Sequence, residues 1–234
     1  MPGETGSAID LYWLPLGAGG HSVRLNGKVF EAVAARVARR DACDLYHSAL
    51  VVEVPEARFV IEQAPAARDG AQRGVVAEGP IGIRTAGHFR IFRYEVRRWR
   101  NGVIPDIGEA VESPQRLCDD PRVAQRLLAL VPHCPAGLWG RDDFHAGEMW
   151  NSNSLVAWLL ARSGIDAEAI VPPARGRAPG WNSGLVVARR QAALDGRRKH
   201  VHAEVSRPRG SASALPLASR PAAREGAVLP LASL

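Results

Sequence analysis

A pair of adjacent apolar segments constrains the fold of this 234-residue chain most strongly. "LYHSALVVEV" at 45–54 and "ARFVIEQAP" at 57–65 are rich in apolar and β-branched residues, and only Pro55 and Glu56 separate them. Two strands joined by so short a link are expected to pair as an antiparallel hairpin. The chain is therefore predicted to build an antiparallel sheet around this hairpin.

Neighbouring segments predict further strands. "GVVAEGPIG" at 74–82 predicts a third short strand or a turn. "HFRIFRYEVRRW" at 88–99 alternates apolar and charged residues, which is typical of a half-exposed strand. Its apolar phase shifts near Ile91, which predicts a β-bulge at that point. An apolar run, "AIDLYWLPL", begins at Ala8 and ends in a Gly-rich turn.

Three segments have helical patterns. "KVFEAVAARVARRD" at 28–41 spaces its apolar residues at helical intervals. A second helix is predicted from about Asp120 to Leu130, because an acidic cap (Asp119 or Asp120) and a proline at the first helical position open it. A third spans 151–163, and Gly164 is suited to close it.

The predicted order of elements is a helix, then several strands, then further helices. This order is typical of an α+β domain. We expect this domain to span residues 1–189, with a final extended segment at 178–190. Residues 190–234 contain no Phe, Trp or Tyr and predict a disordered tail, because they bury too little apolar surface to offset the entropy of ordering. The tail holds eight Lys and Arg residues against three acidic residues, so it carries five of the six net positive charges. The nearly neutral body therefore gives little indication of nucleic-acid binding.

Composition and spacing argue against several classes of protein. No run of about 18 apolar residues predicts a transmembrane helix, and the N-terminus lacks the basic region of a signal peptide. Three cysteines without a C-x-x-C pair argue against a disulfide framework and a structural zinc site. The glycine-rich "GAGGHS" at 17–22 lacks both nucleotide-binding patterns. We therefore expect a cytoplasmic protein without a metal or cofactor.

The predicted helix at 151–163 begins with four small polar residues, "NSNS". A side chain at the first position of a helix lies beside unpaired N–H groups and the positive end of the helix dipole. Both favour an anionic nucleophile or a developing oxyanion. Ser152 is therefore a candidate nucleophile. The alternative is that Asn151 or Ser152 serves only as the helix N-cap.

Two residues of the predicted hairpin are candidate partners of this serine. His47 begins an apolar strand and is either a rigidly held base or a structural histidine. Glu62 lies among apolar residues of the next strand and requires a partner unless it faces water. Pairing of the two strands makes His47 and Glu62 near neighbours. A Ser/His/Glu arrangement of Ser152, His47 and Glu62 is chemically sufficient for acyl transfer.

The blocks "YHSALVVEV", "RFVIEQ" and "WNSNSLVAWLL" resemble the permuted papain-like peptidases and acyltransferases. This group is the circularly permuted branch of the NlpC/P60 superfamily, which includes the lecithin:retinol acyltransferase-like and PPPDE-type proteins. The resemblance implies an antiparallel sheet packed with helices. It also implies His47 as the base, Glu62 as its orienting residue with Gln63 as the alternate, and Ser152 at the nucleophile position after Asn151. The family has cysteine where this chain has Ser152, and a hydroxyl needs stronger base assistance than a thiol.

On this resemblance we expect a hydrolase or acyltransferase that acts on an amide or ester bond of a small molecule, lipid or peptide. Four further residues are expected to bind substrate, namely Asn151, Gln63, Arg141 and His21. Arg141 lies in a loop before the nucleophile position and either binds a carboxylate or is held within the loop by an Arg–Asp pair and Trp packing. The alternatives are a catalytically inactive papain-like binding module and a structural protein with a basic tail.

Overall fold

The computed structural model describes residues 6–16, 39, 41–66, 73–174 and 176–205, with side chains as far as Arg198. Most of the predicted helix at 28–41, His21, and the part of the predicted tail beyond Val205 lie outside the described residues. The chain divides into two units, Met1–Gly196 and Arg197–Leu234. The architecture below is that of the first unit.

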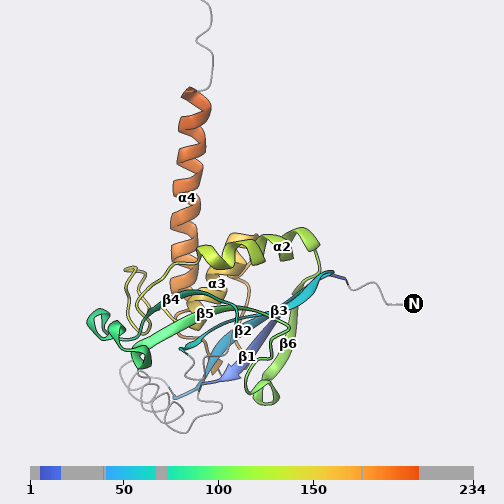
Figure 1. Cartoon of the computed structure of the whole chain (residues 1–234), viewed down its shortest axis with the longest axis vertical. Helices are drawn as coiled ribbons and strands as arrows, with labels where there is room; N and C mark the ends of the chain where they lie inside the picture. Colours follow the sequence, from blue (N-terminus) through green and yellow to red (C-terminus); the bar gives the residue numbers. More distant parts are fainter. Residues whose placement is uncertain (1–5, 17–38, 40, 67–72, 175, 206–234) are drawn as a thin grey trace, which may run out of the picture. The chain divides into compact units, whose positions relative to one another are not determined.

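Six strands form one antiparallel sheet in the order β4-β5-β3-β2-β1-β6 (Figure 1). They are β1 (Ala8–Pro15), β2 (Asp44–Val54), β3 (Ala57–Pro65), β4 (Val75–Pro80), β5 (Arg93–Arg100) and β6 (Val111–Cys118). A two-residue strand, β7 (Gly176–Arg177), pairs in parallel with the start of β2. The predicted hairpin is confirmed, because β2 and β3 pair antiparallel from Leu50 opposite Ile61 to Val54 opposite Ala57.

Two parts of the sheet differ from the sequence-based prediction. The segment predicted as one strand at 88–99 is a strand only from Arg93, and the residues before it form the 3₁₀ turns η1 (Arg84–His88) and η2 (Arg90–Phe92). The phase shift near Ile91 reflects these turns and not a bulge. Strand β6 was not predicted, because its many polar residues and a proline conceal its alternation of exposed and partly buried positions.

Helices α2 (Pro121–Leu130) and α3 (Ser152–Ser163) confirm their predictions. Two further 3₁₀ turns are η3 (Ile107–Glu109) and η4 (Val131–His133). The side chain of Asp120 accepts a hydrogen bond from the Arg122 amide and so caps α2. Gly164 ends α3 in the left-handed conformation at φ 97°, where a residue with a side chain would be strained.

The prediction of a final extended segment at 178–190 is wrong, because helix α4 (Trp181–Val205) begins there. Gly184 allows α4 to approach α3 closely, since a Cβ at this position would collide with the carbonyl oxygen of Ser154. The helix continues past residue 189. Beyond that point Gln191 accepts a hydrogen bond from the indole of Trp158 at 2.8 Å, and Asp195 pairs with Arg162 at 2.7 Å. The packed body thus extends beyond the predicted boundary.

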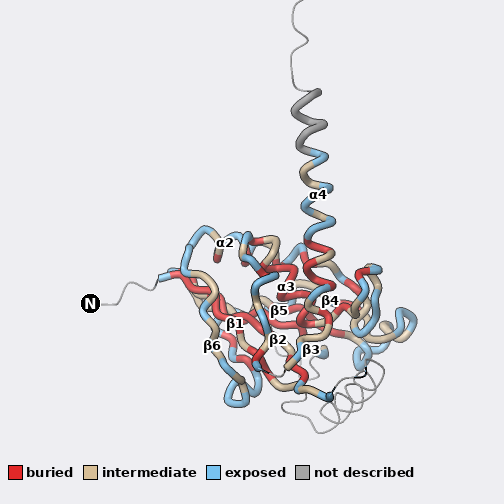
Figure 2. The backbone as a smooth tube through the Cα atoms, turned by 180° about the vertical axis from the view of Figure 1, so that it is seen from behind, coloured by how far each residue is buried: buried red, intermediate tan, exposed pale blue. Residues whose placement is uncertain are grey.

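Strand alternation gives the sheet two faces, and the core divides between them. Helices α2 and α3 cover one face, here called the helix face (Figure 1). Its buried residues include Leu11, Leu50, Ile61 and Val96, which pack with the apolar residues of α3. The opposite face, here called the far face, holds a second cluster of Leu14, Ala49, Val51, Val60 and Ile104. Helix α3 is buried along nearly its whole length (Figure 2).

Candidate functional site at the N-terminus of helix α3

Asn151 is the N-cap of helix α3. Its side-chain oxygen accepts hydrogen bonds from the amides of Asn153 at 2.9 Å and Ser154 at 3.2 Å. The Ser154 hydroxyl accepts from the Asn151 amide at 3.1 Å, which completes a capping box. The side-chain amide of Asn151 donates to the carbonyl oxygen of Pro179 at 2.8 Å. Asn151 is therefore a structural residue that joins α3 to the segment before α4, and its predicted contact with substrate remains untested.

Asn153 attaches the first turn of α3 to strand β2. Its amide nitrogen donates to the carbonyl oxygen of Tyr46 at 2.9 Å, and its oxygen accepts from the Ser48 hydroxyl at 2.9 Å. Strand β2 pairs with β3 only from Leu50 onward, and near Tyr46, where β1 lies along the other edge of β2, the Tyr46 carbonyl group bonds to the Asn153 side chain. Sequence reasoning missed this role. The available signal was the presence of four polar residues where one cap would suffice.

Ser154 and Gly180 complete the packing around this turn. The Ser154 hydroxyl donates to the Gly180 carbonyl oxygen at 2.7 Å, and the Gly180 amide donates to Glu148 at 2.8 Å. A Cβ at Gly180 would meet the oxygens of Asn151, Met149 and Ser154, and the residue has φ 88°. Glycine is therefore required at this position on both grounds.

Ser152 is the remaining member of the four polar residues. It is the first residue of α3 and only 5% exposed. Among the hydrogen bonds of the described residues, none involves its hydroxyl, whereas Asn151, Asn153 and Ser154 are all committed. A hydroxyl at this position experiences the positive end of the helix dipole. It is the one polar side chain of the first turn that has no bonding role in holding the turn together.

His47 does not lie on the same face of the sheet as helix α3. The pairing of β1 with β2 is continuous, with Leu14 opposite His47 and no bulge. Ser48 bonds to Asn153 and so points to the helix face, and its neighbour His47 must therefore point to the far face with Leu14. No hydrogen bond of the described part of the chain joins His47 to Ser152. The expected Ser/His pair is therefore not assembled.

The environment of His47 also makes it a poor base. Burial lowers the pKa of His47 from 6.5 to about 4, and the nearby carboxylate of Asp106 opposes this shift only in part. A base with so low a pKa has little driving force to remove a proton from a hydroxyl near neutral pH. The ring is neutral at pH 7 and carries no charge that would stabilise an anion.

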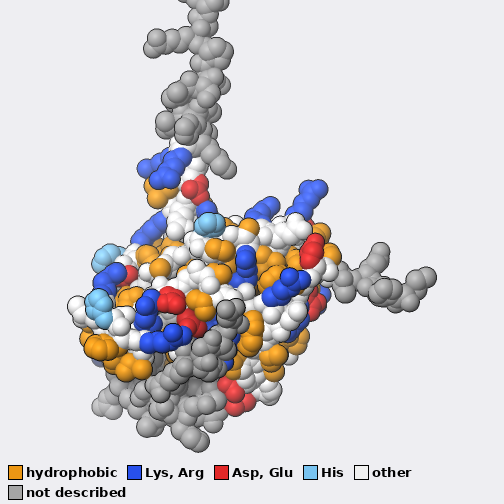
Figure 3. Space-filling model, in the orientation of Figure 1, with side chains coloured by type: hydrophobic (Ala, Val, Ile, Leu, Met, Phe, Trp, Pro, Cys, Tyr) orange, Lys and Arg blue, Asp and Glu red, His pale blue; other side chains and the backbone are white. Residues whose placement is uncertain are grey.

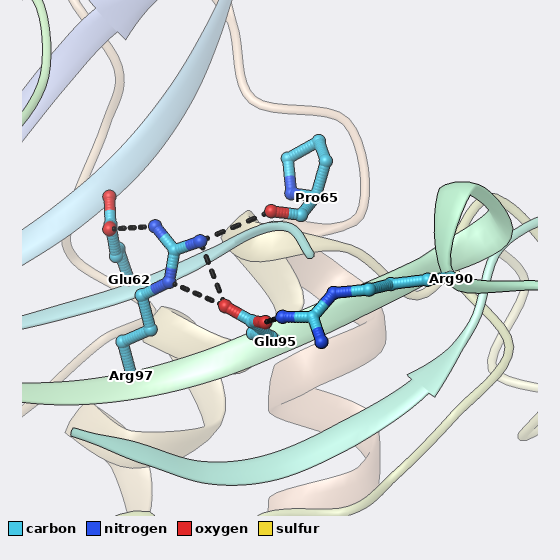
Figure 4. A network of polar contacts seen from close by, with 5 residues as sticks. All are labelled: Glu62, Pro65, Arg90, Glu95 and Arg97. Atoms are coloured by element: carbon cyan, nitrogen blue, oxygen red, sulfur yellow. Dashed lines mark hydrogen bonds and ion pairs between the residues drawn. The ribbon is translucent and has the colours of Figure 1, made fainter. Parts of the chain in front are cut away.

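Glu62 is committed to a buried ion-pair network on the far face (Figure 4). It accepts from Arg97 at 2.8 Å, and Arg97 also binds Glu95 at 2.9 Å and the carbonyl oxygen of Pro65 at 3.1 Å. Arg90, whose guanidinium is 3.5 Å from Glu95, extends the network to the surface. Glu62 and His47 share a face, but the pairing of β2 with β3 ends at Leu50 opposite Ile61, so the hairpin does not pair these two residues as near neighbours. The Glu62 carboxylate is nevertheless held by Arg97, and no hydrogen bond among the described residues joins it to the imidazole of His47.

Gln63, the alternate orienting residue, faces the other way. Alternation from Ile61 places it on the helix face. It is 5% exposed, and neither atom of its side-chain amide has a hydrogen-bond partner among the described residues. A buried amide without partners costs on the order of 1–3 kcal/mol. The hydrogen bonds shown give no structural reason for a glutamine here.

Among the described residues, no ion pair joins Arg141 to an acid of its own loop, so the expected Arg–Asp pair is replaced by a contact with another loop. The Arg141 Nε donates to the Gly82 carbonyl oxygen at 3.1 Å, and the neighbouring Asp143 forms an ion pair with Arg84. Tyr94 and Trp139 pack edge to face with ring centroids 5.6 Å apart. These contacts therefore attach the loop before α3 to the loop after β4. His21 lies outside the described residues.

The described residues contain no group of three or more His, Cys, Asp or Glu side chains that could hold a metal ion. In the same part of the chain, no helix combines the length and apolar character needed to cross a membrane. Comparison of the chain with known proteins found no matching family model, no matching curated protein and no matching solved structure.

Proposed function

We propose that this chain is a catalytically inactive papain-like binding module. In this proposal the N-terminus of α3 receives the carbonyl or carboxylate oxygen of an acyl compound and does not cleave it. The papain-like relationship rests on the resemblance of the three sequence blocks. The antiparallel sheet and the packing of α3 against β2 are compatible with it.

The observation that carries the proposal is the separation of Ser152 from His47 by the sheet. Hydroxyl nucleophiles depend on a base within hydrogen-bonding reach. Ser48 and its bond to Asn153 fix the orientation of β2 relative to α3, so a change of side-chain rotamer does not bring the imidazole to the helix face. The low pKa of His47 weakens it further as a base. Both facts favour binding over turnover.

The polarity of the first turn favours an oxygen-bearing ligand. Three of the four polar side chains are used to hold the turn, and the Ser152 hydroxyl remains uncommitted. The dipole of α3 favours acceptor oxygens and negative charge beside Ser152, whereas the amides of Asn153 and Ser154 are already bonded to Asn151. A carboxylate, ester or amide oxygen fits this preference. Ser152 is 5% exposed, and its hydroxyl is not one of the fully buried side-chain groups without a partner, so it keeps some contact with solvent.

Thiol chemistry tests this proposal directly. In a background with Cys43, Cys118 and Cys134 replaced, Ser152→Cys places a thiol at the start of α3, where the helix N-terminus should lower its pKa. We expect His47→Ala, added to this variant, to leave the rate of alkylation by iodoacetamide at pH 6–7 within about twofold. His133→Ala is the matched control for removal of a histidine.

A catalytic site predicts different results. If His47 supports a thiolate at position 152, its removal should slow alkylation by about tenfold or more. Hydrolysis of p-nitrophenyl acetate by the unmodified chain, lost in both Ser152→Ala and His47→Ala, would also overturn the proposal and restore the hydrolase or acyltransferase interpretation.

A further inference from the structure

Strand β3 buries a glutamine whose side-chain amide has no partner. Gln63 is only 5% exposed, and neither its Nε2 nor its Oε1 has a hydrogen-bond partner among the described residues. An amide is both a donor and an acceptor, and leaving these groups unpaired away from water costs free energy. Gln63 therefore offers a buried donor and a buried acceptor that a bound molecule can satisfy.

Gln63 lies at the end of the sheet where helix α3 begins. Strands β2 and β3 stop pairing at Leu50 opposite Ile61. Two residues further along β3 and two residues back along β2 are Gln63 and Ser48, and alternation places both side chains on the helix face. Ser48 bonds to Asn153 in the first turn of α3, and α3 also contacts β3. The unpaired amide and the N-terminus of α3 are therefore at the same end of the same face.

The first turn of α3 directs Ser152 towards β3. Successive residues of an α-helix project about 100° apart. Asn153 bonds to strand β2, and Ser154 bonds to the residue that precedes α4. Trp181 at the start of α4 packs on Trp13 of β1 with ring centroids 5.2 Å apart, so α4 begins on the β1 side of α3. Ser152 precedes Asn153 and therefore projects to the opposite side, which is the side of β3 and Gln63.

The helix face favours an uncharged ligand. Among the described residues, the buried charged side chains all lie on the far face, and they are Asp10, Glu62, Glu95 and Arg97. On the surface, Figure 3 shows acidic side chains among the basic ones on the face that it draws. The dipole of α3 offsets only a fraction of the cost of burying a carboxylate without a charged partner. A neutral carbonyl group receives the same favourable field without that cost.

We propose that Ser152 and Gln63 together bind a small uncharged molecule that contains a cis amide, such as a lactam or a primary carboxamide. In a cis amide the N–H and the C=O point to the same side. Gln63 Nε2 donates to the ligand carbonyl oxygen, Gln63 Oε1 accepts from the ligand N–H, and the Ser152 hydroxyl donates to the second lone pair of the same oxygen. This inference rests on the proposed function and narrows the class of its ligand.

Other acyl compounds satisfy Gln63 only in part. A trans peptide bond points its N–H and its C=O in opposite directions, so it cannot pair with both atoms of the Gln63 amide. An ester has no N–H, and a carboxylate has only acceptors, so each leaves Gln63 Oε1 without a donor. Sites that bury a hydrogen-bonding group discriminate strongly against ligands that leave the group unpaired.

Four probes of equal size separate these ligands. γ-Butyrolactam has a cis amide, N-methylpropionamide a trans amide, γ-butyrolactone an ester and butyrate a charge, and all have the same number of non-hydrogen atoms. The Gln63 amide is closed off from solvent, so a ligand reaches it only when neighbouring side chains move, and probes of this size keep that movement small. Titration of the full chain, followed by NMR of its amide groups, measures each dissociation constant. We expect γ-butyrolactam to bind at least about tenfold more tightly than the other three probes.

Substitutions at the two residues connect the binding to the site. Gln63→Leu should remove the preference for the lactam and raise the free energy of unfolding, because it removes an unpaired buried amide. Ser152→Ala should weaken lactam binding by roughly threefold to tenfold. Gln125→Leu is the matched control, since Gln125 is exposed on α2, and it should leave lactam binding unchanged. Urea denaturation measures the stability of each variant, and Gln63→Met repeats the test with an unbranched side chain.

Several results would overturn the inference. One is that none of the four probes binds, and another is that Gln63→Leu leaves lactam binding intact, which would place that binding elsewhere. A loss of stability in both Gln63→Leu and Gln63→Met would show that the amide already has a partner, such as an ordered water molecule. If butyrate or γ-butyrolactone bound as tightly as the lactam and lost affinity in Ser152→Ala, the proposed function would stand without the cis amide. Alkylation of the Ser152→Cys variant tests the proposed function separately, so the two failures are distinguishable.

Discussion

The two faces of the sheet hold different kinds of polar group. On the helix face the buried polar residues are neutral, and Ser48 and Asn153 bond to each other while joining β2 to α3. On the far face the apolar cluster is accompanied by ionisable groups. These are Asp10, His47, Glu62, Glu95 and Arg97.

This difference shows that moving one residue along a strand changes which face of the sheet a side chain reaches, and so which polar groups it can contact. His47 and Ser48 are adjacent in the sequence, yet they project to opposite sides of the sheet. The helix face has the helix N-terminus and an uncommitted hydroxyl, whereas the far face has the histidine and the carboxylates. The components of the expected triad are all present and are divided between the two faces.

The largest effect is expected from breaking the charged network of the far face. Arg97→Met leaves Glu62 and Glu95 buried without their main partner, and we expect a loss of about 3–5 kcal/mol in the free energy of unfolding. Urea denaturation measures it. Arg93→Met is the control, because its partly exposed pair with Glu78 should contribute at most about 1 kcal/mol. Equal losses of unfolding free energy in the two variants would mean that the buried network stabilises the fold no more than the partly exposed pair does.

His47 should make stability depend on pH. Its pKa is about 4 in the folded protein and 6.5 without the surrounding structure. The unfolded chain therefore takes up a proton first as the pH falls below 6.5, and the folded state loses up to roughly 3 kcal/mol by pH 4. His47→Gln should reduce the decline in unfolding free energy across this range.

Urea denaturation at several pH values between 7 and 4 measures this dependence. His133→Gln, which removes an exposed histidine, should preserve the decline. If His47→Gln left the decline in unfolding free energy as steep as in the unmodified chain, His47 would titrate normally and the folded protein would not desolvate its ring.

The helix face should be sensitive to loss of Asn153. Asn153→Ala removes the partner of the Ser48 hydroxyl and of the Tyr46 carbonyl group, and leaving such groups buried and unpaired costs about 1–3 kcal/mol. Thermal unfolding followed by circular dichroism measures the loss. Asn151→Ala, which removes the N-cap, should cost about 1 kcal/mol. A neutral Asn153→Ala variant would contradict the attachment of α3 to β2.

The smallest effect is expected at Ser152. Because its hydroxyl makes no hydrogen bond to the described residues, Ser152→Ala should change the free energy of unfolding by less than about 0.5 kcal/mol. The same denaturation experiment measures this difference. A cost comparable to that of Asn153→Ala would show that Ser152 is one more structural residue of the first turn, and the binding proposal would lose its uncommitted hydroxyl.

Local patterns in the sequence predicted the elements that depend on local interactions. Asp120 with the following proline predicted the start of α2, and Asn151 and Gly164 bracket α3 as caps do. The short link between β2 and β3 predicted their hairpin. The segment after Gly180 was misassigned, because its apolar and β-branched residues suit a strand as well as the buried helix that packing against α3 selects.

The sequence by itself determined that Ser152 stands at the start of a helix and that His47 and Glu62 stand on paired strands. Only the tertiary structure decided which side of the sheet each side chain occupies relative to α3. Alternation along β2 makes His47 and Ser48 point to opposite faces of the sheet. The sequence near His47 does not show which of these faces helix α3 covers, because both faces are buried there. The hydrogen bond from Ser48 to Asn153, between residues 105 positions apart, shows that Ser48 points to the helix face and His47 to the far face. A contact of that range depends on packing of the whole sheet against the helices, which no local pattern encodes.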